Sequence, residues 1–553
     1  MRKFFAVIAV FGLAAVASFG LVACGGGSGS TGSSASGGSG KEGGTLNATF
    51  AGFPDYLDPA LSYTQEGWTS MGDVYIPLLT YKHAAGTAGG EVVPGLAKEM
   101  PKITNGGKTY TLFLRPGLKY SNGELVKASD FTVAVERTFK LSSGGSPFYT
   151  DIVGAEKFAE TKKGGIPGIK TNDKTGEIVI NLTNPRGTFS NELALMFVAP
   201  VPQSTPDSNQ STSPIPATGP YMITKANPSK GWSYERNPYW AKANSKAMPE
   251  YPSGHVDKIN VTIITNPSTQ VNDIEQGKFD WMQTEVPPNR YAEVKSKYEG
   301  TQFATEATNS TYYFWMNTTK PPFDDVKVRQ AVNYAVDPAA LERIYVGQIE
   351  GGQQVLPPGM PGYQKLDLYP TNLAKAKELI AEANPSDRDI TVWGDNEAEN
   401  EAAVTYYQDV LEKIGLHTTL KIINADNYFT VIGNLTTPDL DTGWSDWFQD
   451  YPHPNDFFQP LLAAESILPT NNGNFAQFDD PAVNKKTAEL GVEPLGPDQE
   501  AEYAALDKEV MEEAPWAPYG TRTLSTFVSS AINLENVIFS PTFGQYLTSF
   551  EFK

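Results

Sequence analysis

The segment DITVWGDNEAENEAAVTYYQDVLEKIGLHTTLKII, residues 389–423, decides the fold class. Residues 389–393 predict a strand, and residues 401–415 predict a helix that ends at Gly415. Residues 416–423 alternate apolar and polar side chains, which predicts a second strand. A strand, a helix and a strand in close succession form a βαβ unit, in which the two strands run parallel. We therefore expect an α/β protein with a parallel sheet in this part of the chain.

Other stretches predict further helices and hairpins. Residues 169–182 alternate around a turn and predict a hairpin. Apolar side chains at helical spacing in residues 131–139 predict a helix with Ser129 or Asp130 as its N-cap. Asp337 is expected to cap another helix, because a proline follows it at the first helical position. No repeat of fixed period is visible, and the chain is too long for one ordinary domain.

The N-terminus predicts export from the cytoplasm. Residues 1–23 form a signal peptide in which two basic residues precede the apolar run 4–19. Small residues then precede Cys24, the only cysteine of the chain. Residues 21–24 resemble a bacterial lipobox, at which the cysteine receives a diacylglyceryl group and becomes the first residue. The alternative is a structural or reactive thiol that merely lies near the start.

Residues 24–44 are expected to anchor and tether the protein. Acyl chains on Cys24, each contributing about 0.8 kcal/mol per buried CH₂, would hold it on a membrane. The glycine- and serine-rich residues 25–44 cannot bury a core, and a flexible chain of that length reaches about 25 Å. We therefore expect a globular body held at the outer face of the cytoplasmic membrane.

Composition and motifs exclude several classes of function. The net charge of −20 argues against nucleic acid as a partner. Four scattered histidines lack metal-binding spacing, and an acylated Cys24 leaves no thiol for catalysis, a disulfide or a metal. The Gly-Lys-Thr at residues 107–109 resembles part of a phosphate loop, but Lys102 replaces the required first glycine. We expect no enzyme, cofactor or metal, although a glycosidase-like carboxylate pair in a surface-anchored hydrolase remains an alternative.

The strongest candidate for a functional site is GWSDWFQDYPHPNDFFQPLL, residues 443–462. Aromatic side chains alternate there with three aspartates, and Pro452 and Pro454 predict a loop rather than a helix start. One possibility is a core loop that buries its own rings. The other is a concave site with aromatic walls and an anionic end, where a buried carboxylate would need a cation such as a ligand ammonium group.

Motifs along nearly the whole mature chain resemble one family, the ABC-transporter solute-binding proteins of the peptide/nickel class. They are LDPAL (57–61), PGLAKEMP (94–101), YTLFLRPGLKYSNGELVKASDF (110–131), TGPY (218–221), RNPYW (236–240), EQGKFDW (275–281), PPFDDVKVRQAVNYAVD (321–337) and QDYPHPNDFF (449–458). Each motif is weak alone. Their order behind a lipobox makes the resemblance specific.

The resemblance implies the type II fold of periplasmic binding proteins, with three lobes. Lobe I would comprise residues 45–80, 210–305 and 520–553, lobe II residues 81–209, and lobe III residues 306–519. Ligand would lie in a cleft between lobes I and III, which close around it. The implied partners are a small solute, most simply a peptide, and an ABC permease complex that recognises the closed form. The receptor itself would be a monomer.

The resemblance also implies the ligand contacts. Peptide-binding members hold the ligand backbone by main-chain hydrogen bonds. An aspartate in the loop matching QDYPHPNDFF binds the peptide amino group, a role that falls on Asp450 in preference to Asp446. The alternative is that Asp450 caps the following turn. The other expected ligand-binding residues are Tyr63, Trp444, Trp447, Phe448 and Tyr451. Two other solutes stay open: a sugar oligomer stacked on these rings, or a metallophore held through His453, as in nickel-binding relatives.

Overall fold

The computed structural model describes residues 41–553. The predicted signal peptide, Cys24 and residues 25–40 of the predicted tether lie outside the described residues. Among residues 41–553 no helix combines the length and the apolar character needed to cross a bilayer.

The βαβ unit predicted from residues 389–423 is confirmed. Strand β15 (Asp389–Asp395) is followed by helix α11 (Ala398–Lys413) and strand β16 (His417–Ile423). The two strands pair in parallel over their whole length, from Asp389 opposite His417 onward. Gly415 ends the helical segment with φ +96°, a left-handed conformation that favours glycine.

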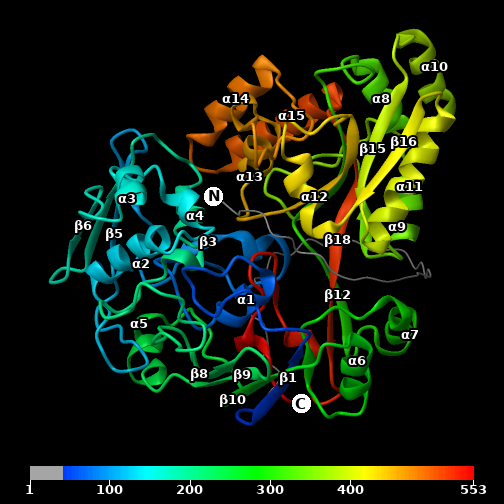
Figure 1. The fold of residues 1–553 in the computed structure, drawn as a ribbon. Coiled ribbons are helices and arrows are strands. Elements are labelled where there is room, and N and C mark those ends of the chain that lie inside the picture. The colour runs from blue at the N-terminus through cyan, green and yellow to red at the C-terminus, as the bar shows by residue number, and fades with distance from the viewer. Residues whose placement is uncertain (1–40) are drawn as a thin grey trace, which may run out of the picture.

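One large mixed sheet runs through the molecule (Figure 1). Its strand order is β16-β15-β17-β13-β18-β11-β1-β10-β9-β8, and two further strands, β12 and β14, pair with β18. The bounds are β17 Thr442–Phe448, β13 Ser310–Met316, β18 Trp516–Val528, β11 Trp281–Met282, β1 Thr45–Phe50, β10 Lys258–Ile263, β9 Gly231–Arg236, β8 Tyr221–Asn227, β12 Phe303–Ala307 and β14 Ile349–Gly351.

Strand β18 belongs to both parts of this sheet. Its first residues, Trp516–Gly520, pair with β13, and its later residues, Thr523–Phe527, pair with β12. In Figure 1, β18 and β12 run from the part that holds β15 and β16 to the part that holds β1 and β8–β10. We call the part with β13 and β15–β17 the C-terminal part of the sheet, and the part with β1 and β8–β11 the N-terminal part.

Helices pack around this sheet and around the smaller sheets. Their bounds are α1 Gln65–Met71, α2 Ala128–Lys140, α3 Ala155–Thr161, α4 Phe189–Glu192, α5 Ser245–Ala247, α6 Pro267–Glu275, α7 Pro288–Tyr298, α8 Val326–Ala335, α9 Pro338–Ile344, α10 Leu373–Ala383, α12 Ala425–Ile432, α13 Asn455–Leu462, α14 Pro481–Gly491 and α15 Pro497–Glu513. Asp337 caps α9 as predicted, because its carboxylate accepts the Ala339 N–H at 3.1 Å.

A separate four-stranded sheet lies to one side, in the order β4 (Lys102–Thr104), β5 (Thr109–Phe113), β7 (Glu177–Asn181) and β6 (Ile169–Asn172). The last two strands form the predicted hairpin. The prediction of Ser129 or Asp130 as N-cap of α2 is wrong, since the helix begins at Ala128 and Lys127 is the N-cap. Asp130 instead lies at the third helical position, where its carboxylate accepts the Lys127 N–H at 2.9 Å.

Two separate large cores stabilise the molecule. One contains only residues between Tyr312 and Tyr519, while the other joins residues from Leu46 to Trp281 with Tyr451 and residues near the C-terminus. A third, small core lies around α6 and α7. The boundaries of the three expected lobes stay predictions.

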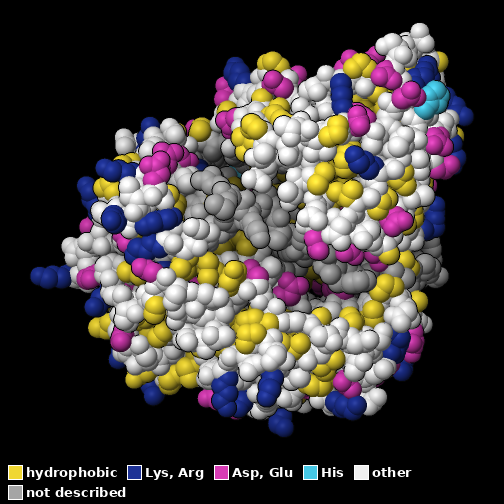
Figure 2. Space-filling model, in the orientation of Figure 1, with side chains coloured by type: hydrophobic (Ala, Val, Ile, Leu, Met, Phe, Trp, Pro, Cys, Tyr) yellow, Lys and Arg dark blue, Asp and Glu magenta, His cyan; other side chains and the backbone are white. Residues whose placement is uncertain are grey.

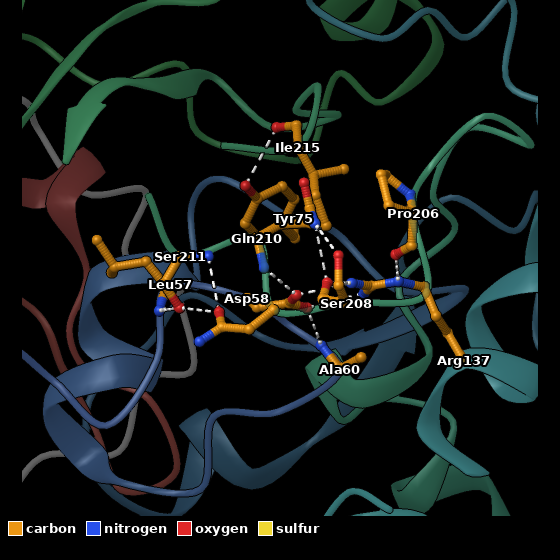
Figure 3. A network of polar contacts seen from close by, with 11 residues as sticks. Leu57, Asp58, Ala60, Tyr75, Arg137, Pro206, Ser208, Gln210, Ser211 and Ile215 are labelled. Atoms are coloured by element: carbon orange, nitrogen blue, oxygen red, sulfur yellow. Dashed lines mark hydrogen bonds and ion pairs between the residues drawn. The ribbon is translucent and has the colours of Figure 1, made fainter. Parts of the chain in front are cut away.

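A buried ion pair joins α2 to the segment that precedes α1 (Figure 3). Asp58 and Arg137 are both fully buried, and the guanidinium donates to the two carboxylate oxygens at 2.8 and 2.7 Å. Two further guanidinium hydrogens, on Nε and Nη2, donate to the carbonyl oxygens of Pro206 and Ser208, both at 2.8 Å. The pair therefore ties three chain segments together, and every nitrogen of the guanidinium donates at least one hydrogen bond.

Candidate ligand-binding cleft

A cavity of about 290 Å³ lies between the two parts of the sheet. In the space-filling view, several acidic side chains lie between the upper and the lower part of the molecule (Figure 2). The lining comes from both sides. Residues 63–65, 68, 541 and 542 lie beside the N-terminal part, and residues 308–475 supply most of the rest, while Arg522 and Leu524 come from β18. The volume is close to the lower end of the range for small-ligand pockets.

Strand geometry places the predicted residues of β17 on the cavity wall. Side chains alternate between the faces of a strand, so Trp444, Asp446 and Phe448 share one face. Tyr312 of β13 lies directly opposite Asp446 and also lines the cavity. Trp447 is on the other face of β17 but lines the cavity near the end of the strand.

Aromatic rings form much of the wall. Trp444 stacks on Tyr428 with centroids 5.6 Å apart and on Tyr312 at 6.4 Å, and it meets Phe429 edge to face. Only 3% of Trp444 is exposed, so packing as well as the cavity fixes its position. Such a wall offers flat apolar contact to a ligand.

Asp450 lies at a contact across the cleft. Its Oδ1 accepts a hydrogen bond from the Tyr63 hydroxyl at 2.6 Å, and both residues line the cavity. Behind it, Oδ2 of buried Asp456 accepts the Asp450 N–H at 2.8 Å and the Trp447 Nε1–H at 3.3 Å. Burial raises the pKa of both carboxyl groups, and for Asp456 the charge of Asp450 adds to the effect. Within residues 41–553 neither carboxylate forms an ion pair with a cationic side chain. The site therefore holds two adjacent carboxyl groups without a counter-charge.

Asp446 occupies a second acidic position in the same cavity. Burial raises its pKa to about 7, the charge of Asp395 acts in the same direction, and Arg522 opposes it. Asp446 and Asp450 thus both line the cavity, so the structure brings together the aspartate that the resemblance favoured and its alternative.

The segment after Asp450 differs from its prediction. Helix α13 begins at Asn455, directly after Pro454, so the expectation of a loop without a helix start is wrong. Proline is compatible with the beginning of a helix because its missing N–H would have no intrahelical partner there. Phe457 and Phe458 are fully buried in the core. Tyr451 also lies outside the cavity lining and packs against Phe148 with ring centroids 6.0 Å apart.

His453 does not lie on the cavity wall. Its side chain is fully buried, burial lowers its pKa to about 3, and Nδ1 accepts the Asn455 N–H at 3.1 Å. Within residues 41–553 no three His, Cys, Asp or Glu side chains cluster as metal ligands. The position of His453 gives no support to a metallophore held through this residue.

Sequence reasoning missed Arg522. It lines the cavity from the middle of β18, yet it stands in the unremarkable run TRTLST. Its neighbours on the wall come from residues far away in the chain, so no local pattern marks it. Thr542 is similar: it accepts a hydrogen bond from Gln449 across the cleft at 3.0 Å, and nothing in its local sequence indicates this role.

Comparison with known proteins identifies the class. The solved structure titled Clavulanic acid biosynthesis oligopeptide binding protein 2 is 26% identical and superposes with a TM-score of 0.83, covering 93% of this chain and 96% of that one. Heme-binding protein A of Haemophilus influenzae is 26% identical over 484 residues, 81% of this chain and 82% of the relative. The oligopeptide-binding protein OppA of Bacillus subtilis is 24% identical over 394 residues, 67% and 70% of the two chains. The fold is that of a type II periplasmic binding protein, as expected.

The model of the bacterial extracellular solute-binding proteins, family 5 Middle, matches residues 91–467. The chain therefore belongs to this family, and the resemblance to ABC-transporter solute-binding proteins of the peptide/nickel class is confirmed. These relatives are binding proteins, not enzymes.

Proposed function

We propose that this protein is the receptor of an ABC importer that binds short peptides in the cleft and delivers them to its permease. The lobes close around the ligand, and the closed form is what the permease recognises. A lipid on Cys24 holds the receptor at the outer face of the cytoplasmic membrane. Support for the anchor comes from the lipobox-like sequence alone, and support for the importer comes from the family.

One observation carries the peptide assignment: the carboxyl group of Asp450 lies at the edge of an aromatic cavity, with buried Asp456 behind it and no cationic side chain of residues 41–553 paired with either. A buried carboxylate is costly without a cation or hydrogen-bond donors. A peptide ammonium group supplies both, since it carries a positive charge and three N–H donors. The Tyr63 hydroxyl already donates one hydrogen bond to Asp450, which orients the carboxylate toward this contact.

Blocking the ligand amino group tests the assignment. We expect wild-type protein to bind short peptides with free amino termini at least about tenfold more tightly than their N-acetylated forms, because a charge-assisted hydrogen bond to a desolvated carboxylate is lost. Replacement Asp450→Asn should reduce the affinity for free peptides and leave the acetylated peptides little changed. Isothermal titration calorimetry measures both.

The control is Asp367→Asn, which removes the same charge from an exposed position outside the cavity lining. It should bind like the wild type. Equal losses of free and acetylated peptides in Asp450→Asn would contradict the role of Asp450. If Asp446→Asn alone removed the preference for free amino groups, the role would pass to Asp446. Binding of a sugar oligomer in place of every peptide would keep the receptor and overturn its ligand.

A further inference from the structure

The cavity has a strong imbalance of charge. Four carboxylates line it: Asp446, Asp450, Glu397 and Glu399. Arg522 is the one lysine, arginine or histidine among the residues that line this cavity. A single cation in an otherwise acidic cleft marks a position where a ligand with both charges could place its negative group.

Arg522 differs from the other buried arginines in the described part of the chain. Arg137 binds Asp58 through two hydrogen bonds, and the guanidinium of Arg329 donates to the carbonyl oxygens of Glu513 and Phe323. Arg522 is only 7% exposed, yet within residues 41–553 its guanidinium forms neither an ion pair nor a hydrogen bond. Its hydrogen bonds are made by its main chain, to Ser310 and Thr308.

In the described part of the chain, the carboxyl groups near Arg522 do not form an ion pair with its guanidinium. Arg522 lowers the pKa of Asp446 and of Glu285, which shows that its charge acts on both. Burial nevertheless keeps each of these pKa values raised to about 7, so neither group is fully ionised at neutral pH. A desolvated guanidinium with five N–H donors is therefore left for a ligand.

The place of Arg522 in the fold suits a binding role. It lies on β18 between the residues that pair with β13 and those that pair with β12, so it stands where the shared strand crosses the cleft. It pairs with Ile349 of β14, which holds its backbone in the sheet. Asp450 reaches the same cavity from the loop after β17.

We propose that Arg522 binds the carboxylate of the ligand. A guanidinium matches a carboxylate with two parallel hydrogen bonds, which an ammonium or a neutral group cannot reproduce. The ligand class is then a short peptide with a free C-terminal carboxylate, held by Arg522 at one charged group and by Asp450 at the other. This inference rests on the proposed peptide function and deepens it.

Selection from a defined pool tests the inference. The full chain is incubated with an equimolar pool of synthetic dipeptides to pentapeptides, each present as the free acid and as the C-terminal amide. Retained peptides are recovered by ultrafiltration and identified by mass spectrometry. Free acids should be retained roughly tenfold more than their amides, as expected when a bidentate charged contact is lost. The variant Arg522→Gln should lose this preference, and Arg522→Lys should keep part of it.

Arg343→Gln is the matched control, since it removes the same charge from a side chain that is 71% exposed and outside the cavity. It should retain the wild-type preference. Equal retention of acids and amides by the wild type would overturn the role of Arg522 while leaving peptide binding intact. A preference that survives in folded Arg522→Gln, as judged by its melting curve, would also overturn it. Retention of no peptide at all would overturn the peptide function and this inference together.

Discussion

The neighbourhood of Asp450 combines features that separately would destabilise a protein. Its carboxylate is next to Asp456, and both have raised pKa values because burial disfavours the charged form. Two hydrogen bonds, from Tyr63 to Asp450 and from the Asp450 N–H to Asp456, hold the groups in place. Buried groups with raised pKa values are typical of functional sites, where a bound ligand can supply the missing partner.

The pH dependence of the free energy of unfolding tests whether burial of the Asp446 carboxylate destabilises the folded protein. The pKa of Asp446 in the folded protein, about 7, lies above the ordinary value of about 3.9. The folded state therefore binds more protons than the unfolded state between these values, and the stability from this group is present below about pH 4 and is lost as the pH rises through about 7. Asp446→Asn should gain about 2.5 kcal/mol relative to wild type between pH 5 and pH 8, at roughly 1.4 kcal/mol per pKa unit.

Urea unfolding of both proteins at pH 5 and pH 8, without ligand, measures that difference. Asp367→Asn, at an exposed position, is the control. A gap between Asp446→Asn and wild type that stays constant with pH, or that moves in the opposite direction, would show that Asp446 is not held in a desolvated position.

Most of the single residues that could be predicted lie in the aromatic and acidic segment 443–462. The resemblance indicated Asp450 and Tyr63, which the structure joins by a hydrogen bond, although their assignment as ligand contacts stays a prediction. Tyr451 was grouped with them as an aromatic residue of the same segment, but its ring packs on Phe148. Arg522 was not found, because an isolated arginine in a polar strand has no pattern until folding brings the cavity around it.

At the scale of elements, local periodicity predicted well and distant pairing could not be predicted. The β15-α11-β16 unit is confirmed because its apolar positions recur within one short segment. The pairing of β18 with β13 and β12 joins residues far apart in the chain. The alternation of apolar and polar side chains predicts a strand but does not indicate which other strand it pairs with. The start of α13 was missed because two prolines were taken to exclude a helix that in fact begins directly after the second.

The buried ion pair between Arg137 of α2 and Asp58, in the segment before α1, gives a prediction at the scale of elements. Arg137→Met should lower the free energy of unfolding by about 3 to 5 kcal/mol, because Asp58 would stay fully buried without its cation. Chemical denaturation measures the loss. The exposed control Arg343→Met should change stability by about 0.5 kcal/mol or less. A loss below about 1 kcal/mol for Arg137→Met would mean that the segment relaxes and hydrates Asp58.

For the whole molecule, the arrangement of cores and strands supports closure around a ligand. The two large cores do not merge, and β18 with β12 runs between the parts of the sheet that they stabilise (Figure 1). The cavity takes residues from both sides, so a ligand would add contacts that favour the closed form. We expect the radius of gyration measured by small-angle X-ray scattering to fall when a saturating peptide is added. An unchanged radius with bound peptide would contradict closure.

Native mass spectrometry of the full chain, incubated with the defined peptide pool, tests the central claim most directly. The account predicts one-to-one complexes with intact short peptides, which are released unchanged when the protein is denatured. It also predicts that Asp450→Asn loses most of these complexes and that Asp367→Asn keeps them. A spectrum without peptide complexes, or with cleaved peptides, would contradict a peptide receptor in this cleft.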